Sequence, residues 1–403
     1  MRLTVPSLML CVFGITTGEF VIAGILPDIA TDLAVSIPAA GLLVTAYAIG
    51  MIVGGPVLTA LTARFPRKPL ILVLLGITVA GNLASALAPA YGVLFAARIV
   101  TALVTSTFFA NAIVIAVSTA APGKQASTVS KLVFGMNLSM ILGAPIGTFI
   151  GEDHGWRATF LAVAACCAAG LLLVWRLVPD VRDAGAGTGA GTGAGTGAGT
   201  GAGTGGGTSA VAELRVFRAR DVQLAIAVTA VGNAGLLMVF TFFAPLVTNV
   251  TGFPAASVAV LLLVYGVGAA VGNFAGGRLS DRAPMRSQLG LLGVLAAALV
   301  LMWAVSGSLV LTAVMVFVLG AVGFSVIPGM QARVLSTASA APTLAMAVNA
   351  SAYQLAAAFA AWLGGRVIDG GFGLRSLYVV AAAVTLAGIA VSSYAWRRAR
   401  VPA

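Results

Sequence analysis

The chain has 403 residues, of which 60% are hydrophobic and only 8% are charged, and its mean hydropathy is +1.07. A soluble domain of this size cannot bury so much apolar surface, so the composition excludes a soluble globular protein and indicates one that lies in lipid. The formal net charge is +11, but the basic residues are scattered through short connectors instead of clustering on one face, which argues against a nucleic-acid partner.

The first segment begins with Arg2 and an apolar run, as a signal peptide does. Glu19 interrupts this run and no small-residue cleavage site follows cleanly, so we expect a retained first transmembrane helix. The cysteines Cys11, Cys166 and Cys167 all lie in apolar runs. The last two are sequence neighbours that point apart on a helix, so no structural disulfide is expected.

Twelve apolar stretches are long enough to cross a bilayer, which takes about 20 residues. In chain order the predicted spans are 6–27, 37–62, 69–89, 92–119, 129–151, 156–177, 222–247, 256–277, 287–306, 309–331, 343–365 and 375–396. We therefore predict an all-α, polytopic membrane protein whose spans form two pseudo-symmetric six-helix bundles. The N-terminal bundle is expected over 1–179, a cytoplasmic linker over 180–220 and the C-terminal bundle over 221–403.

The linker contains a simple repeat over 185–208, with five copies of GAGT and one of GGGT. Glycine has no side chain to pack, so a flexible tether is expected, with a root-mean-square span of roughly 27 Å. A regulatory loop is the alternative interpretation.

The basic residues predict the orientation of the spans. If the N-terminus is cytoplasmic, the inner connections and termini hold 18 lysines and arginines, whereas the outer loops hold Arg157, Arg366 and Arg375. Because short cytoplasmic loops carry an excess of basic residues, both termini and the linker are expected in the cytoplasm and the protein in the cell membrane.

The two predicted halves share a sequence pattern at a constant offset of 218 residues. The pattern Tyr47, Gly50, Gly54, Leu61, Arg64, Pro66 and Lys68 recurs as Tyr265, Gly268, Gly272, Leu279, Arg282, Pro284 and Arg286, and Gly14, Val21 and Pro27 match Gly232, Val239 and Pro245. Two copies of a membrane half in the same chain order are a common plan of secondary transporters.

One signature lies between the eighth and ninth predicted spans. The segment Gly277-Arg-Leu-Ser-Asp281-Arg282 resembles the G-x-L-a-D-R signature of the major facilitator superfamily, and with twelve spans and a central linker the resemblance covers the whole chain. It implies the major facilitator fold, with Asp281 latching one conformation through hydrogen bonds and basic neighbours.

The first copy of this signature departs from the family pattern. Ala63 replaces the aspartate, so the N-terminal latch is expected to be weaker or to use Arg64, Arg67 and Lys68 on another partner. The alternative is that these cations only satisfy the topology rule.

The fifth predicted span contains Gly143, Pro145, Gly147 and Gly151. Small residues four apart allow helices to approach closely, and proline bends the helix. This pattern resembles the antiporter motif of drug-exporting members of the superfamily, although the paired glycines of that motif are incomplete. Ordinary helix packing is the alternative.

The first span carries Thr17-Gly18-Glu19-Phe20-Val21, followed by Leu26-Pro27-Asp28-Ile29-Ala30. With segments 40–50 and 155–160, this resembles twelve-span drug:proton antiporters, most closely actinobacterial chloramphenicol-resistance exporters. The related sugar-efflux group shares much of the pattern. The resemblance implies small-molecule drugs and protons as partners.

Two charges lie well inside the predicted membrane. Glu19 is about 12 Å and Arg98 about 10 Å below the outer surface at 1.5 Å per residue. Such charges are costly and mostly face a cavity or a partner. The position that matches Glu19 in the second half is Leu237, so the fold does not require the acid. Either Glu19 carries a proton, or it forms a structural bridge with Arg98. Asp28 could relay protons or be a solvated helix end.

Several uncharged residues are candidates for a substrate cavity. Thr101 and Thr105 follow Arg98 at helical spacing, and Asn349 and Tyr353 share a face. The remaining candidates are Asn137, Asn233 and Phe240. Amides also join helices in lipid, and phenylalanines pack in cores, so each has a structural alternative.

The resemblance and the buried acid together predict a monomeric, proton-coupled exporter of small amphipathic drugs, with phenicols as the best substrate guess. A sugar or metabolite exporter, an importer or uniporter, and a non-transporting receptor are the alternatives. No GxxxxGK[ST] sequence is present, so this chain does not itself bind ATP through a P-loop. The only histidine is His154 and no metal-ligand cluster is seen, so neither a cofactor nor an enzyme is expected.

Overall fold

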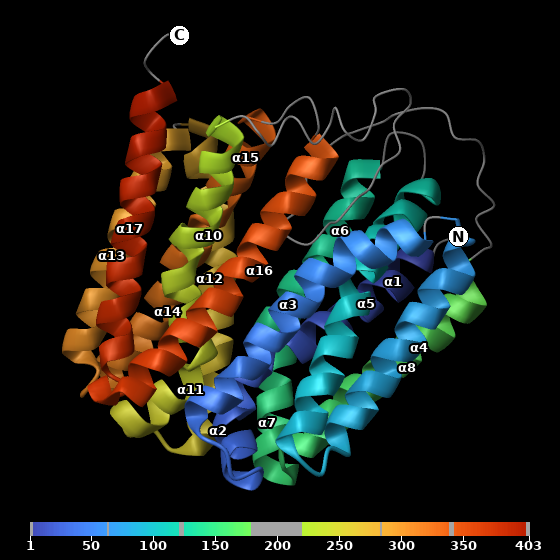
Figure 1. Ribbon diagram of the computed structural model, residues 1–403, viewed down its shortest axis with the longest axis horizontal. Coiled ribbons are helices and arrows are strands. Elements are labelled where there is room, and N and C mark those ends of the chain that lie inside the picture. The colour runs from blue at the N-terminus through green and yellow to red at the C-terminus, as the bar shows by residue number, and fades with distance from the viewer. Residues whose placement is uncertain are drawn as a thin grey trace.

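The computed structural model describes residues 3–62, 64–120, 125–178, 220–282, 284–337 and 342–399. Two helical bundles stand side by side, one from each half of the chain (Figure 1). The predicted linker lies outside the described residues except for Arg220, where the second bundle begins.

The N-terminal bundle follows the six predicted spans closely. Its elements are α1 (Thr4–Phe20), α2 (Ile22–Asp32), α3 (Ile37–Thr62), α4 (Arg67–Ala86), α5 (Tyr91–Ser118), α6 (Gln125–Leu138), the π-helical turn η1 (Ser139–Gly143), α7 (Ala144–His154) and α8 (Trp156–Leu177). The first span is broken at Val21, where α1 and α2 meet at 50°. The fifth span is α6, η1 and α7 in sequence. Pro145 has no N–H to donate, and the helix widens to a π turn in the residues before it.

The C-terminal bundle repeats this plan. Its elements are α10 (Arg220–Thr241), α11 (Phe243–Pro245), η2 (Leu246–Val250), η3 (Ala255–Ser257), α12 (Val258–Arg282), α13 (Pro284–Val305), α14 (Leu309–Ser325), α15 (Ile327–Thr337), α16 (Pro342–Val367), η4 (Ile368–Phe372) and α17 (Ser376–Ala399). Within the described residues, ten helical segments are long and apolar enough to cross a membrane, and the bent α1–α2 pair makes eleven. The one predicted span outside this set is the eleventh in chain order, which is α16, and its 26 residues extend about 39 Å.

The offset of 218 residues holds in three dimensions. Gly155 and Gly373, which are separated by that offset, both turn the chain into the last helix of their bundle with positive φ values of 83° and 77°. Gly54 of α3 lies against the carbonyl of Leu103, and Gly272 of α12 lies against that of Ala321. A Cβ atom at either glycine would clash with backbone. The repeated glycines therefore keep α3 close to α5 and α12 close to α14.

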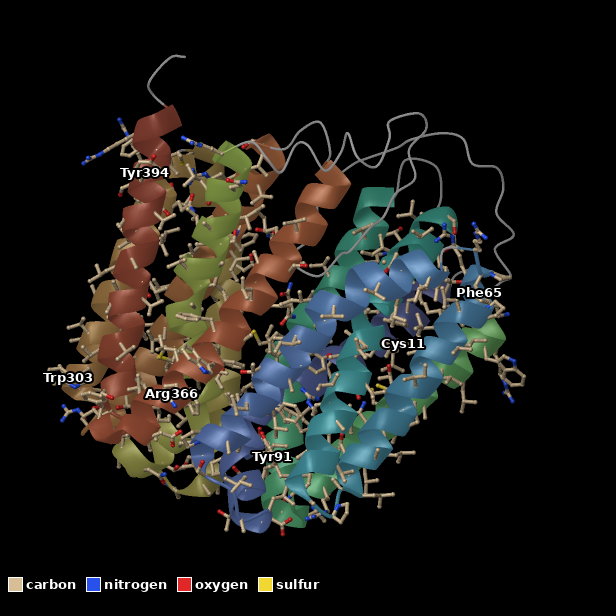
Figure 2. The ribbon with its side chains drawn as sticks, in the orientation of Figure 1. Cys11, Phe65, Tyr91, Trp303, Arg366 and Tyr394 are labelled. Atoms are coloured by element: carbon tan, nitrogen blue, oxygen red, sulfur yellow. The ribbon has the colours of Figure 1, made fainter. Side chains whose placement is uncertain are left out.

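The ends of the spans alternate between the two sides of the molecule. Phe65, which precedes α4, lies toward the end that holds both chain termini, whereas Tyr91 at the start of α5 lies toward the other end (Figure 2). In the C-terminal bundle Tyr394 and Trp303 show the same alternation. Both described ends of the chain therefore lie on one side.

The bundles contact each other at the end opposite the termini. At this end α2 meets α11 and α12, and the first residues of α3 meet the last turns of α16. Gly41 of α3 and Gly364 of α16 both face the ring of Phe242. Nearer the middle, Thr45 Oγ1 donates a hydrogen bond to the Ala358 carbonyl at 3.2 Å.

The signature at 277–282 lies on a helix and not in a loop as predicted, because α12 continues to Arg282. Its residues have no helix-breaking side chain after Gly277, and the first break comes near Pro284. Asp281 and Arg282 are exposed, as is Arg64 at the equivalent place in the first half. Gly277 has open space around its Cα. Ala63, the residue behind the predicted weaker N-terminal latch, lies outside the described residues.

The glycines of the fifth span face the first span of their own bundle. Gly143 contacts Thr17, Gly147 contacts Val21 and Gly151 contacts Ile25. The three positions lie four residues apart, so together they form one continuous seam that brings η1 and α7 against α1 and α2. Pro145 is buried beside this seam. The seam gives the packing interpretation of this motif a physical basis.

Candidate functional site

A cavity with about 470 Å³ of space not filled by atoms lies between the two bundles, and we call it the charged cavity. The N-terminal bundle contributes Glu19, Phe20, Ile22, Ala23, Val44, Tyr47 and Arg98, and the C-terminal bundle contributes Leu237, Phe240, Thr241, Tyr353, Gln354 and Ala357. Its two formal charges therefore both come from the first half of the chain, and its walls are otherwise apolar or uncharged.

Glu19 reaches across this cavity to the other bundle. Its Oε1 atom accepts a hydrogen bond from Nε2 of Gln354 on α16 at 3.0 Å. Beside it, the rings of Phe20 and Phe240 make an edge-to-face contact with centroids 5.8 Å apart. A carboxylate at the end of α1 is thus held by a neutral donor from α16. The hydrogen bond between the two bundles at this point therefore involves an ionisable group.

Arg98 is held entirely by its own bundle. Its side chain is 1% exposed, Nη1 donates to the Gly18 carbonyl at 2.8 Å, and the guanidinium lies 4.3 Å from the ring centroid of Tyr47. The bend at Val21 presents this carbonyl, because the regular helix ends two residues later. The aromatic face and the carbonyl both compensate a buried cation.

Glu19 and Arg98 line one cavity but do not form the predicted structural bridge. No nitrogen–oxygen contact within 4.0 Å joins them among the described contacts of these two residues. Both side chains reach the same cavity, but they do not pair directly, because the Gly18 carbonyl takes the guanidinium of Arg98 and Gln354 takes the carboxylate of Glu19.

A second cavity, the amide cavity, adjoins the first at Phe20 and Tyr353 and has about 680 Å³ of space not filled by atoms. It is lined by Phe20, Met136, Asn137, Met140, Thr229, Asn233, Asn273, Phe324, Ile327, Met330, Gln331, Asn349 and Tyr353. The structure thus brings together Asn137, Asn233, Asn349 and Tyr353, four of the predicted cavity residues. Of the other three, Phe240 lines the charged cavity instead.

Other predicted site residues lie outside both cavities. Thr105 makes a 3.2 Å hydroxyl contact with Tyr47, and Thr101 packs on Gly81, so this stripe faces the interior of the N-terminal bundle. Asp28 is exposed near the end of α2. The predicted latch residues Gly277, Asp281 and Arg282 lie in the last turns of α12, and Arg64 follows the end of α3.

Several residues of the site escaped the sequence analysis. Gln354 follows Tyr353 directly, yet a glutamine in an apolar span gives no sign of which helix it faces. Asn273 and Gln331 were missed for the same reason. Asp32, the last residue of α2, accepts a hydrogen bond from Trp156 Nε1 at 3.2 Å and forms an ion pair with Arg157. The acid lies 124 residues from this tryptophan, so no local pattern connects them.

Two helical bundles related by a repeat, with a cavity between them, are a common plan of secondary transporters. The family model described as Major Facilitator Superfamily matches residues 8–343. The chain belongs to the Major Facilitator Superfamily, whose members are transporters and not enzymes, and it is a multi-pass membrane protein.

Two relatives share the same level of sequence identity with the chain. It is 34% identical to "Inner membrane transport protein YdhP" of Escherichia coli (strain K12), over 97% of this chain and 95% of that one. It is also 34% identical to "Chloramphenicol resistance protein" of Streptomyces lividans, over 89% of this chain and 87% of that one. Among solved structures, "Crystal structure of D-xylose-proton symporter" covers 98% of both chains with a TM-score of 0.74 and 16% identity, a likeness of fold.

Proposed function

We propose that this transporter exports small amphipathic drugs in exchange for protons, with phenicol antibiotics as the leading substrates. The observation that carries the proposal is the hydrogen bond between Glu19 of the first bundle and Gln354 of the second, inside a cavity between them. A titratable group at a contact between two rocking bodies can couple proton binding to their motion. The relative named for chloramphenicol resistance supports the choice of substrate.

The chemistry of Glu19 differs between its two charge states. The ionised carboxylate only accepts hydrogen bonds, so it accepts from the Gln354 amide, as in this structure. The protonated acid is neutral and carries a donor of its own, which weakens the attraction to Nε2 and permits another partner. Proton binding therefore loosens the bundles here, and proton release tightens them.

The cavities and the contacts between bundles suggest a direction for the cycle. The bundles meet at the end opposite the chain termini (Figure 1). The amide cavity is lined by residues of α6, α10 and α15, and on α16 by Asn349, which precedes Gln354, the partner of Glu19. With the termini in the cytoplasm, as the basic residues predict, this arrangement faces inward. Drug enters from the cytoplasm and favours release of the proton from Glu19. The loaded carrier then rocks outward.

The driving force of this cycle comes from the membrane. Each proton that moves inward supplies about 2.3 kcal/mol per 100 mV of membrane potential, with a further contribution from the pH gradient. Arg98 remains in place through the cycle because its contacts to Gly18 and Tyr47 lie within one bundle. It serves as a fixed positive charge that shifts the proton affinity of Glu19.

The test is Glu19→Gln, measured as chloramphenicol efflux against a concentration gradient in cells and in proteoliposomes. The substitution keeps the shape of the side chain but carries no proton, so we expect uphill efflux to be abolished while binding of the drug to purified protein persists. Asp369→Asn is the matched control, because this exposed acid lies outside both cavities and is not a candidate for proton coupling, so its loss should leave efflux unchanged. Uphill efflux by the Glu19→Gln variant would refute the coupling.

Sugar export is the second candidate. Amide side chains bind hydroxyl groups well, but the same cavity holds Phe20, Phe324 and three methionines, which favour a ligand with an apolar body. A resistance panel of phenicols, dyes and sugar analogues, with and without a protonophore, separates the two candidates. Resistance to phenicols that the protonophore removes supports the drug exporter, and protection against sugar analogues alone supports the rival.

A further inference from the structure

We infer that the amide cavity selects uncharged ligands, with an aromatic or apolar body and several hydrogen-bonding groups, and rejects permanent ions. The inference rests on the proposed function, because it names the class of substrate for that transporter. It concerns the ligand site and not the proton site, so each can fail without the other.

The polar side chains of this cavity are all neutral. Five carboxamides line it, from four helices of the second bundle and one of the first: Asn137, Asn233, Asn273, Gln331 and Asn349. A carboxamide offers two donors and an acceptor, so a ring of them can match hydroxyl, amide or nitro groups of either hydrogen-bonding polarity.

Two of these amides are held in place by protein. Asn349 Oδ1 accepts a hydrogen bond from Thr229 Oγ1 at 2.7 Å, and Asn233 Nδ2 donates to the Thr229 carbonyl at 2.8 Å. The same Nδ2 lies 3.1 Å from the sulfur of Met330. This group forms a preorganised wall on α10, α15 and α16.

The other three amides keep their hydrogen-bonding capacity for a ligand. Asn137, Asn273 and Gln331 make no side-chain hydrogen bond to any part of the protein that the structure describes, and each is partly exposed in the cavity. They come from α6, α12 and α15, and therefore from both bundles. A polar group left without a partner in an apolar surrounding is costly, so a ligand that satisfies these groups gains affinity.

The apolar lining is suited to molecules of differing shape. Met136, Met140 and Met330 have unbranched, polarisable side chains that adapt to a ligand and contact aromatic rings favourably. Phe20, Phe324 and Tyr353 supply rigid aromatic surface. An aromatic ligand with polar substituents matches this combination better than a polyol, which has no apolar body.

The absence of charge decides the selectivity. None of the described residues that line the amide cavity is an acid or a base, and Glu19 lies in the neighbouring cavity, where it accepts a hydrogen bond from Gln354. An ion moved from water into such a site loses hydration without gaining a counter-charge. A neutral ligand meets no such penalty, so the cavity discriminates by charge.

The experiment measures binding to the purified full-length protein in detergent. The probes are uncharged arenes bearing hydroxyl, amide or nitro groups, chloramphenicol among them, and the permanent cations tetraphenylphosphonium and ethidium. We expect at least one neutral probe to bind about tenfold or more tightly than either cation, a difference of about 1.4 kcal/mol or more. Binding of the cations alone, or with equal affinity, overturns the inference, as does failure of every neutral probe to bind.

Placing an acid in the cavity should reverse the preference. Asn273→Asp, and independently Gln331→Glu, should raise cation affinity about tenfold and lower that of the neutral probe. Asn249→Asp adds the same charge at an exposed position outside the cavity and is the matched control. If neither cavity variant differs from the control, the selectivity arises elsewhere and the inference is wrong.

The outcome is independent of proton coupling. In the Glu19→Gln background we expect the same preference for neutral probes, because Glu19 does not line the amide cavity. Charge-selective binding without proton-driven efflux in the unmodified protein would leave this inference standing and overturn the proposed function. Proton-driven efflux without charge-selective binding would leave the proposed function standing and overturn this inference.

Discussion

Tyr47 of the first half and Tyr265 of the second occupy equivalent places, 218 residues apart, on α3 and α12. The guanidinium of Arg98 lies over the ring of Tyr47, whereas Tyr265 stacks on Phe240 with ring centroids 5.4 Å apart. One duplicated aromatic side chain therefore faces a cation in one bundle and an aromatic cluster in the other. The shared helix arrangement has been adapted to two different environments.

The polar residues follow the same division. Glu19 and Arg98 correspond to Leu237 and Val316, so both charges belong to the first half. The amides of the second half replace other residue types of the first: Asn233, Asn273, Gln331 and Asn349 correspond to Ile15, Gly55, Ile113 and Lys131. Under the proposed function, the first bundle handles the proton and the second supplies most of the hydrogen-bonding groups for the ligand.

The largest effect is expected when the carboxylate of Glu19 is moved from the first half of the chain to the second. Leu237 lines the same cavity as Glu19, so Glu19→Leu with Leu237→Glu keeps one carboxylate there. We expect complete loss of uphill efflux, because the acid then shares a bundle with Gln354 and no longer joins two bodies. Proteoliposome efflux under an imposed pH gradient measures it, and Glu19→Leu alone is the reference. Restored efflux would mean that any carboxylate in the cavity suffices.

Replacing the duplicated glycines tests whether the two halves pack alike. Gly54→Ala and Gly272→Ala should each lower the free energy of unfolding by about 1–3 kcal/mol or more, because the new methyl group meets a backbone carbonyl of the neighbouring helix. Gly277→Ala is the control, since open space surrounds that position. Thermal unfolding in detergent measures the effect. A tolerated alanine at only one of the two equivalent sites would contradict the equivalence.

Removing the donor from the second bundle should weaken coupling without affecting the fold. Gln354→Leu deletes the hydrogen bond to Glu19, and bonds to charged groups contribute about 1.5–3 kcal/mol, so efflux should fall about tenfold or more. Gln288→Leu on α13 is the control, since this buried glutamine lies outside both cavities. Equal efflux by the Gln354→Leu variant and the control, measured as initial rates, would show that Glu19 acts alone.

The smallest effect is expected at the end of the bundles opposite the termini. Asp32→Asn removes the ion pair with Arg157. The side chain of Asp32 is 46% exposed and that of Arg157 is 39% exposed, and such exposed pairs contribute little to stability. The second half has Val250 at that place, and its Arg375 donates to the Trp303 carbonyl instead. We expect a slight fall in the unfolding midpoint and unchanged efflux. A large loss of efflux would show that the Asp32–Arg157 ion pair takes part in transport.

Much of the fold could be predicted because hydropathy and repetition are local properties of the sequence. The span predicted over 92–119 is α5 (Tyr91–Ser118), and the same offset that aligns the repeats also aligns the turns at Gly155 and Gly373. The signature at 277–282 begins where an apolar run ends, so the sequence predicts that it connects two spans. Polar residues do not break a helix, and α12 continues through them.

The site was predictable only in part. The sequence singled out Glu19 and Arg98, because a charge in an apolar span is costly wherever it points. It could not distinguish Asn349, which lines a cavity, from Thr101, which packs on Gly81, since uncharged polar groups are common in both places. Rotation of each helix about its axis decides between the two, and the weak amphipathicity of these spans leaves that rotation unspecified.

By itself, the sequence determined that this protein lies in a membrane, that its two halves are copies, and that the buried charges belong to the first. Tertiary structure alone decided that Glu19 meets Gln354, 335 residues away, and that Arg98 turns to Gly18 and Tyr47. The physical reason is that the cost of burying a group depends on its own chemistry, whereas its partner depends on how helices from two bundles are rotated and packed together.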